Sequence, residues 1–271
     1  MRVGLDYPFH HSSRKGLKSY GKKERRMIKM KVVIDPGHGG SDTGATGFGL
    51  READVALKLA ELVGEYFGKY EGAVVTFTRN RNTSSSYPGP PEGLRKRIAY
   101  ANSTNADLFL SLHCNAGGGS GFESYIAKGA PARTQKIQNA INDSVLGYLK
   151  GYGIGPHGNV AKNDTQGAYS RIAVLRDTKM SAVLLENLFI DNPKENKLLR
   201  DRRFLDGLAK AIVKGVAVAF GLKEKVAKPK PMYRVTVDGK EIVDTAYEDK
   251  IATIVVESIR KSVKEINIKE I

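Results

Sequence analysis

The sequence predicts an α/β fold, a mostly parallel sheet with helices on both faces, followed by a small C-terminal α+β unit of ββαβ type. From residue 31 to about residue 222, short apolar segments alternate with longer segments of helical periodicity. This alternation is typical of parallel strands joined by helices. A charged, proline-containing linker is predicted at 223–232, and it precedes the ββαβ pattern of residues 233–271.

The first unit, residues 31–222, contains five of the six helices that we predict. Apolar runs bounded by turn residues predict strands at 32–35, 73–78, 107–112, 122–127, 172–175 and 182–185. Apolar residues repeat every three or four positions where we predict helices, at 52–70, 93–103, 131–148, 193–200 and 203–220. Two segments rich in glycine and small polar residues predict long loops, at 79–91 and 151–167.

The C-terminal unit has short strands predicted at 233–237, near 242–243 and at 266–268, with a helix at about 249–263. A unit of this size buries little apolar surface when it folds by itself. We therefore expect its helix to pack closely on its sheet.

Composition and charge narrow the class of protein. The chain has 271 residues and a formal net charge of +15, and residues 1–30 carry nine Lys/Arg against two acidic residues. We call residues 1–30 the leader. This segment lacks the apolar periodicity of a helix or strand, which predicts disorder or added sequence. No basic stripe with interleaved aromatics or nucleic-acid motif is found, so no nucleic-acid partner is expected.

Apolar segments and cysteine content exclude further classes. No apolar run approaches the roughly 18 residues that span a membrane, and no apolar region of a secretory signal follows the basic leader. We therefore predict synthesis in the cytoplasm without membrane insertion. A single cysteine, Cys114, excludes an internal disulfide and a multi-cysteine metal site.

Four polar residues stand where predicted strands end or helices begin. His38 follows the first strand within Asp35-Pro36-Gly37-His38-Gly39-Gly40, Glu52 starts the first long helix, and His113 and Glu186 follow apolar strands. The carboxyl ends of parallel strands share one edge of a sheet, where ligands gather. Two histidines and a glutamate there predict a zinc site with a position open for water, and the other glutamate could exchange protons with that water.

Each of these residues also has a structural interpretation. His38 alone fits a turn, Glu52 a first-turn acid favoured by the helix dipole, and His113 a buried histidine. Glu186 is harder to explain in this way, because an unpaired carboxylate in a core is costly. We further expect the glycines around His38 to leave room for metal, water and substrate.

Three other features of the sequence compete with this site or lie next to it. Cys114 is adjacent to His113 and should point to the opposite face of the strand, so core packing is favoured over zinc ligation. His157 lies in a predicted loop, either at the surface or against substrate. The glycines of 37–49 lack the spacing of a phosphate-binding loop.

The first motif, Asp35-Pro36-Gly37-His38-Gly39-Gly40 with Asp42 and Glu52, resembles the opening of the zinc-dependent N-acetylmuramoyl-L-alanine amidases of the amidase-3 type. Thr78-Arg79, the pattern Leu94/Arg97/Ala101-Asn102, the segment 107–115 and the segment 186–199 also resemble motifs of that family. The resemblance implies that His38, Glu52 and His113 bind Zn²⁺ and that Glu186 is the catalytic glutamate. Cys114 and Asn187 depart from the family's common residues.

The resemblance also implies the reaction, which is hydrolysis of the amide between N-acetylmuramic acid and L-alanine in peptidoglycan. Residues 233–271 are similar to small wall-binding modules, which implies a cell-wall polymer as a partner; a generic dimerisation unit is the alternative. Without a signal peptide, a phage endolysin released through holin pores is favoured over a host autolysin. A non-catalytic wall-binding protein and a zinc peptidase acting on the stem peptide are further alternatives. The sequence leaves the oligomeric state open.

Overall fold

The computed structural model describes residues 29–166, 171–226 and 232–271. The predicted leader, residues 1–30, falls almost wholly outside the described residues, as does 227–231 of the predicted linker. The chain divides between Lys223 and Glu224 into two compact units. In the parts that the structure describes, no helix is long and apolar enough to cross a membrane.

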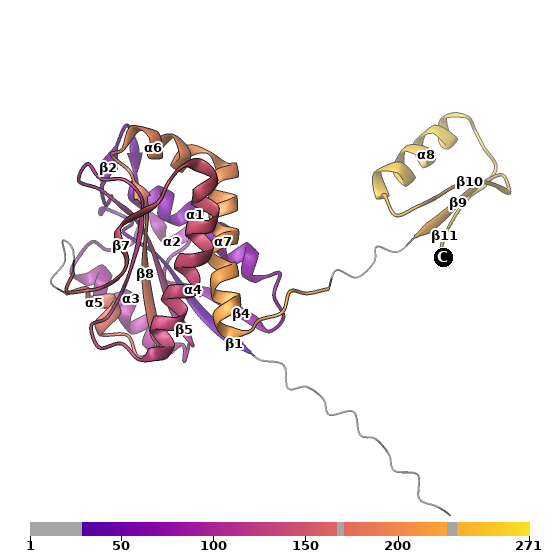
Figure 1. Ribbon diagram of the computed structural model, residues 1–271. Coiled ribbons are helices and arrows are strands. Elements are labelled where there is room, and N and C mark those ends of the chain that lie inside the picture. Colours follow the sequence, from indigo (N-terminus) through magenta and orange to yellow (C-terminus); the bar gives the residue numbers. More distant parts are fainter. Residues whose placement is uncertain (1–28, 167–170, 227–231) are drawn as a thin grey trace, which may run out of the picture. The chain divides into compact units, whose positions relative to one another are not determined.

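The first unit is built on a six-stranded sheet with the order β4-β1-β5-β8-β6-β7 (Figure 1). Parallel pairing joins β4, β1, β5 and β8, whereas β6 runs antiparallel to β8 and parallel to β7. The prediction of a mostly parallel sheet is therefore confirmed. The strands are β1 (Met30–Pro36), β4 (Ala73–Phe77), β5 (Leu108–Asn115), β6 (Phe122–Ile126), β7 (Pro156–Asn163) and β8 (Ser181–Phe189), and a small hairpin adds β2 (Thr46–Gly47) and β3 (Leu50–Arg51).

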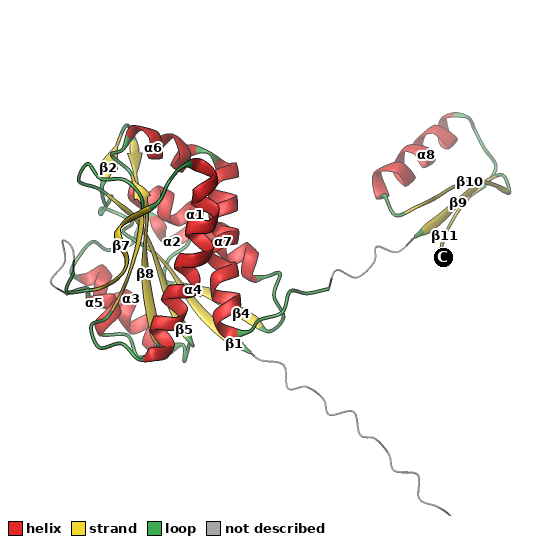
Figure 2. Cartoon of the chain, in the orientation of Figure 1, coloured by secondary structure: helices red, strands yellow, loops and turns green. Residues whose placement is uncertain are grey.

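Helices cover both faces of this sheet, but not equally (Figure 2). The long helices α1 (Glu52–Phe67), α4 (Ala132–Leu149) and α7 (Arg202–Phe220) lie on one face, while α3 (Glu92–Ser103) and the short α5 (Ala173–Arg176) lie on the other. A further helix, α6 (Pro193–Arg200), precedes α7.

The alternation of side chains along β5 shows how the two faces differ. Leu108, Leu110 and Leu112 belong to the large core beneath α1, α4 and α7, while Phe109 belongs to the smaller cluster beneath α3 and α5. Successive side chains of a strand point to opposite faces. His113 is therefore on the side of Phe109, the sparsely covered face, and Cys114 returns to the large core.

Three local predictions were wrong. The predicted strand 172–175 is the helix α5, because a four-residue apolar run does not reveal its periodicity. The predicted loop 151–167 contains a 3₁₀ turn (Lys150–Tyr152) and β7, an edge strand whose half-exposed residues give no apolar pattern. The predicted loop 79–91 contains α2 (Arg81–Ser84), which Asn80 caps with its side chain.

The second unit contains an antiparallel sheet, β10-β9-β11, and one helix. The strands are β9 (Tyr233–Val237), β10 (Lys240–Thr245) and β11 (Ile266–Glu270), and the helix is α8 (Glu248–Arg260). The ββαβ order agrees with the prediction. The expectation that the helix packs closely on the sheet was wrong, because only Val235, Thr245 and Ser258 of the unit's described residues are buried.

Candidate metal centre

His38, Glu52 and His113 converge near the carboxyl edge of the sheet. His38 lies in the loop after β1, Glu52 is the first residue of α1, and His113 lies in β5. Oε1 of Glu52 lies 3.1 Å from Nε2 of His38 and 2.9 Å from Nδ1 of His113, and the two histidine nitrogens are 3.2 Å apart. Among the described residues, this is the one His/Cys/Asp/Glu group able to hold a metal ion.

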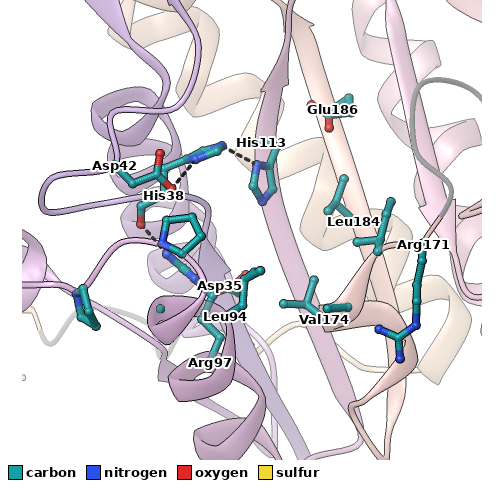
Figure 3. A pocket seen from close by; sticks show the side chains of 15 residues that line it. Asp35, His38, Asp42, Leu94, Arg97, His113, Arg171, Val174, Leu184 and Glu186 are labelled. Carbon is teal, nitrogen blue, oxygen red and sulfur yellow. Dashed lines mark hydrogen bonds and ion pairs between the residues drawn. The ribbon is translucent and has the colours of Figure 1, made fainter.

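Glu186 is on the strand next to that of His113. The prediction that both residues end their strands was wrong, since β5 continues to Asn115 and β8 to Phe189. His113 and Glu186 are register partners in parallel strands, and both line the same cavity. Figure 3 shows Glu186 across from His113, with His38 and Asp42 on the other side. The four predicted residues therefore share one site, which lies on the face of the sheet near its carboxyl edge.

Glycines near His38 stand where a Cβ atom would collide with side chains of the candidate metal group. A Cβ on Gly37 would lie 2.3 Å from the ring of His113, and one on Gly44 would lie 2.6 Å from both Oε2 of Glu52 and Cδ2 of His38. Our expectation that these glycines clear space for metal, water and substrate is thus corrected. They allow the three side chains and their backbone to approach one another.

Asp42 orients His38, a role that the sequence analysis did not assign. One carboxylate oxygen of Asp42 lies 2.9 Å from Nδ1 of His38, and the other accepts a hydrogen bond from the Gly44 amide at 3.0 Å. Metal-binding histidines usually contact such a carboxylate through their second ring nitrogen, which fixes the tautomer. The available signal was an acid four residues after His38 in the same glycine-rich loop.

The Glu52 carboxylate is held by the backbone as well as by the two histidines. Its Oε2 accepts a hydrogen bond from the Ala45 amide and its Oε1 one from the Cys114 amide. Burial acts to raise the pKa of Glu52, but the hydrogen bonds from His113 and His38 outweigh burial and hold this pKa well below its usual range. Burial acts to lower the pKa of His38, yet Glu52 and Asp42 raise it on balance.

The three donor atoms fit a divalent metal ion such as zinc. Zinc bonds of about 2.0–2.2 Å place tetrahedral ligand atoms roughly 3.3–3.6 Å apart, close to the 2.9–3.2 Å separations found here. With Nδ1 of His38 directed at Asp42, its Nε2 faces Glu52 and His113. Two imidazoles and one carboxylate are also a ligand set that zinc accepts.

Two cavities flank the group formed by His38, Glu52 and His113. One, of about 280 Å³, is bordered by His113, Glu186 and the apolar side chains of Leu94, Val174 and Leu184. The other, of about 500 Å³, is lined by polar residues that include Glu123, His157 and Lys162. His38 and Asp42 border both cavities. A bond held at this group therefore has room for a substituent on each side.

The remaining sequence candidates fall outside the ligand group. Cys114 is buried in the large core, which agrees with its interpretation as a packing residue. Burial raises the pKa of its thiol. His157 is half-buried against the ring of Phe189 and borders the polar cavity. Asn187 donates a hydrogen bond to the carbonyl of His113 at 3.1 Å, so this departure from the family pattern links β8 to β5.

Fold and site together define an α/β protein with a His-Glu-His group and a nearby buried carboxylate near the carboxyl edge of the sheet. Residues 32–218 match the family model described as N-acetylmuramoyl-L-alanine amidase (Amidase_3). The chain belongs to this family, which confirms the predicted enzyme class, a hydrolase acting on a carbon–nitrogen bond in peptidoglycan.

Individual proteins show the same likeness. The chain is 35% identical over 209 residues to the N-acetylmuramoyl-L-alanine amidase CwlM of Bacillus licheniformis, covering 77% of this chain and 74% of CwlM. It is 36% identical over 197 residues to the endolysin of Bacillus phage SPP1, covering 72% of this chain and 67% of the endolysin. An N-acetylmuramoyl-L-alanine amidase structure from Clostridium difficile 630 superposes with a TM-score of 0.61 at 26% identity, covering 71% of this chain and 97% of that one.

Proposed function

We propose that this chain is a zinc-dependent amidase that hydrolyses the bond between N-acetylmuramic acid and L-alanine in peptidoglycan. The observation that carries the proposal is the convergence of His38, Glu52 and His113 beside Glu186 in a chain of the amidase family. When bound, zinc would supply Lewis acidity to the attacking water and to the scissile carbonyl. The three converging side chains would hold it.

Glu186 has the position of a general base. It borders the same cavity as His113 and is buried, so a carboxylate there is shielded from bulk water. It would take a proton from the attacking water and return it to the leaving amine of L-alanine. The cavities on either side of His38 would accommodate the muramyl side and the peptide side of the amide.

The test is digestion of purified peptidoglycan with and without a chelator, with the new termini identified by mass spectrometry. We expect release of stem peptides with a free N-terminal L-alanine, loss of this activity with chelator and recovery with zinc. New amino groups within the stem peptide would instead identify a peptidase. Cleavage that survives complete metal removal would contradict the zinc assignment.

The domain division is also a proposal: residues 31–222 as the catalytic domain, 223–232 as the linker and 233–271 as a cell-wall-binding domain. The separate compact unit from Glu224 onward supports it. Comparing the full chain with a chain ending at Lys223 tests it by co-sedimentation with cell walls. We expect the shorter chain to sediment less while still cleaving soluble muramyl peptides; equal sedimentation would contradict the binding role.

For the biological role we infer a phage endolysin acting on the wall of its host after holin-dependent release. Similarity to the SPP1 endolysin supports this role, whereas similarity to CwlM supports a bacterial autolysin as the alternative. Gene neighbourhood discriminates between them. We expect a holin gene beside this one if the protein is an endolysin. Neighbouring genes for sporulation or wall turnover would instead favour the autolysin.

A further inference from the structure

Arg79 is a cation in the interior of the first unit, and neither the fold nor the proposed catalysis yet accounts for it. Only 1% of its surface is exposed, and its guanidinium donates hydrogen bonds to four uncharged oxygen atoms. Across the described ranges, no carboxylate lies within ion-pair distance of it. Burying a cation without a counterion is costly, so a specific arrangement must compensate.

The acceptors of Arg79 belong to the segments that carry two of the metal ligands. Nε donates to the carbonyl of Pro36 at 3.0 Å, while Nη2 donates to the carbonyl of Gly37 at 2.6 Å and to that of Ala53 at 2.9 Å. Gly37 directly precedes His38, and Ala53 directly follows Glu52. One guanidinium thus bridges the loop of His38 and the first turn of α1.

Arg97 completes the hold on the same loop. It donates to the carbonyl of Pro36 at 2.7 Å and also to the carbonyl of His38, and its charge is balanced by Asp35. The carbonyls of residues 36, 37 and 38 are therefore all bound by one or both arginines. His38 itself has a φ of 59°, a left-handed conformation that is uncommon for residues other than glycine.

The packing around Arg79 is arranged for an arginine. A Cβ on Gly39, whose φ is +123°, would lie 2.8 Å from Cδ and Nε of Arg79, so only glycine allows this approach. Burial, with Arg97 nearby, lowers the pKa of Arg79 to about 10, which leaves the guanidinium charged at neutral pH. The planar guanidinium of arginine has five N–H donors and can donate hydrogen bonds to several carbonyls at once, whereas the ammonium of lysine cannot match that geometry.

We propose that Arg79 is a positioning residue for the metal centre: by bridging the carbonyls of Gly37 and Ala53, it sets the separation of His38 and Glu52 and thereby the affinity for zinc. This inference rests on the proposed zinc site. It differs from a purely structural role because it predicts an effect on metal affinity beyond any effect on folding. Residues that support metal ligands typically change affinity 10–100-fold when they are replaced.

The test compares Arg79→Lys with wild type in the full chain. Zinc affinity is measured by competition with a chelating dye, metal-free stability by thermal unfolding, and ligand geometry by the visible spectrum of the cobalt-loaded protein. We expect a 10–100-fold weaker zinc affinity and an altered cobalt spectrum in the folded variant. Arg176→Lys is the matched control, because Arg176 pairs with the fully buried Asp164 away from the ligands and should change stability but leave zinc affinity close to that of wild type.

A folded Arg79→Lys protein with wild-type zinc affinity and cobalt spectrum would overturn the proposal. If that variant does not fold, Ser84→Ala decides, because Ser84 accepts a hydrogen bond from Nη1 of Arg79 at 2.7 Å and lies outside the ligand segments. A measurable loss of zinc affinity in Ser84→Ala supports the proposal, and unchanged affinity overturns it. Failure of the wild-type chain itself to bind zinc would instead reject the proposed metal site.

Discussion

Oδ2 of Asp42 lies 2.9 Å from Nδ1 of His38, and the Nε2 of the same ring lies 3.1 Å from Glu52. The ring is therefore fixed at both nitrogen atoms. Because the first contact favours a proton on Nδ1, the lone pair of Nε2 is directed toward the position where a metal would bind. Asp42 thus orients the His38 ring toward the other two residues of the candidate metal group.

Replacing Asp42 with asparagine should weaken zinc binding by about 10–100-fold, since the carboxylate that orients the ligand is lost. The measurement is competition with a chelating dye at neutral pH. Asp54→Asn is the control, because Asp54 is an exposed acid of α1 that pairs with Arg51. Equal zinc affinities for the two variants would show that Asp42 does not support His38.

Glu186→Gln should keep zinc bound and lose turnover. The amide is nearly the same size as the carboxylate but does not accept a proton at neutral pH, so the rate constant kcat should fall by about 10²–10⁴-fold. Zinc content is measured by metal analysis after dialysis, and turnover by release of free L-alanine termini. Glu61→Gln, which removes a surface partner of Arg81, serves as the control. Turnover near the wild-type rate would remove Glu186 from the mechanism.

Gly44 and Gly158 provide a matched pair for testing the close packing at the ligands. Their φ values are +63° and +60°, so alanine introduces similar backbone strain, of the order of 1 kcal/mol, at both positions. Only at Gly44 would the new methyl group meet Glu52 and His38, whereas nothing lies within 4 Å at Gly158. We expect both variants to lose some stability and Gly44→Ala alone to lose zinc affinity. A similar zinc affinity in both would contradict the packing argument.

The sequence predicted the strands and the helix that carry the four candidate residues well, because each segment has a strong local signal. A proline and glycines end β1 before His38, and apolar runs mark the strands that contain His113 and Glu186. The helical pattern that begins at Glu52 is equally clear. These signals are local in the chain, so they need no knowledge of the tertiary structure.

What the sequence did not predict depends on distant contacts or on weak patterns. The extent of β5 and β8 beyond their apolar runs is set by pairing between strands, which brings the polar residues His113 and Glu186 into register. The edge strand β7 buries too little to show alternation. The bridge formed by Arg79 joins carbonyl groups 26 and 42 positions away, and backbone acceptors leave no trace in a residue pattern.

Asp35 should give the first unit part of its stability against acid. Burial acts to raise the pKa of Asp35, but Arg97 and the hydrogen bonds from Thr78 and Ser111 outweigh burial, so the pKa is lowered in the folded state. A carboxylate with a lowered pKa stabilises the fold above its unfolded pKa of about 3.9. That contribution is lost as the pH falls through the lower, folded-state pKa.

Asp35→Asn should therefore reduce the stability of the metal-free protein at neutral pH, by about 3–5 kcal/mol, because Arg97 would stay buried without its counterion. Below pH ~4 its stability should also fall less steeply than that of wild type, since this carboxylate no longer takes up a proton on unfolding. Thermal unfolding between about pH 2.5 and 7, in the presence of chelator, measures both effects. Asp54→Asn, with its exposed side chain, should follow the wild-type curve throughout. An Asp35→Asn curve parallel to that of wild type in acid would show that Asp35 does not titrate with the fold.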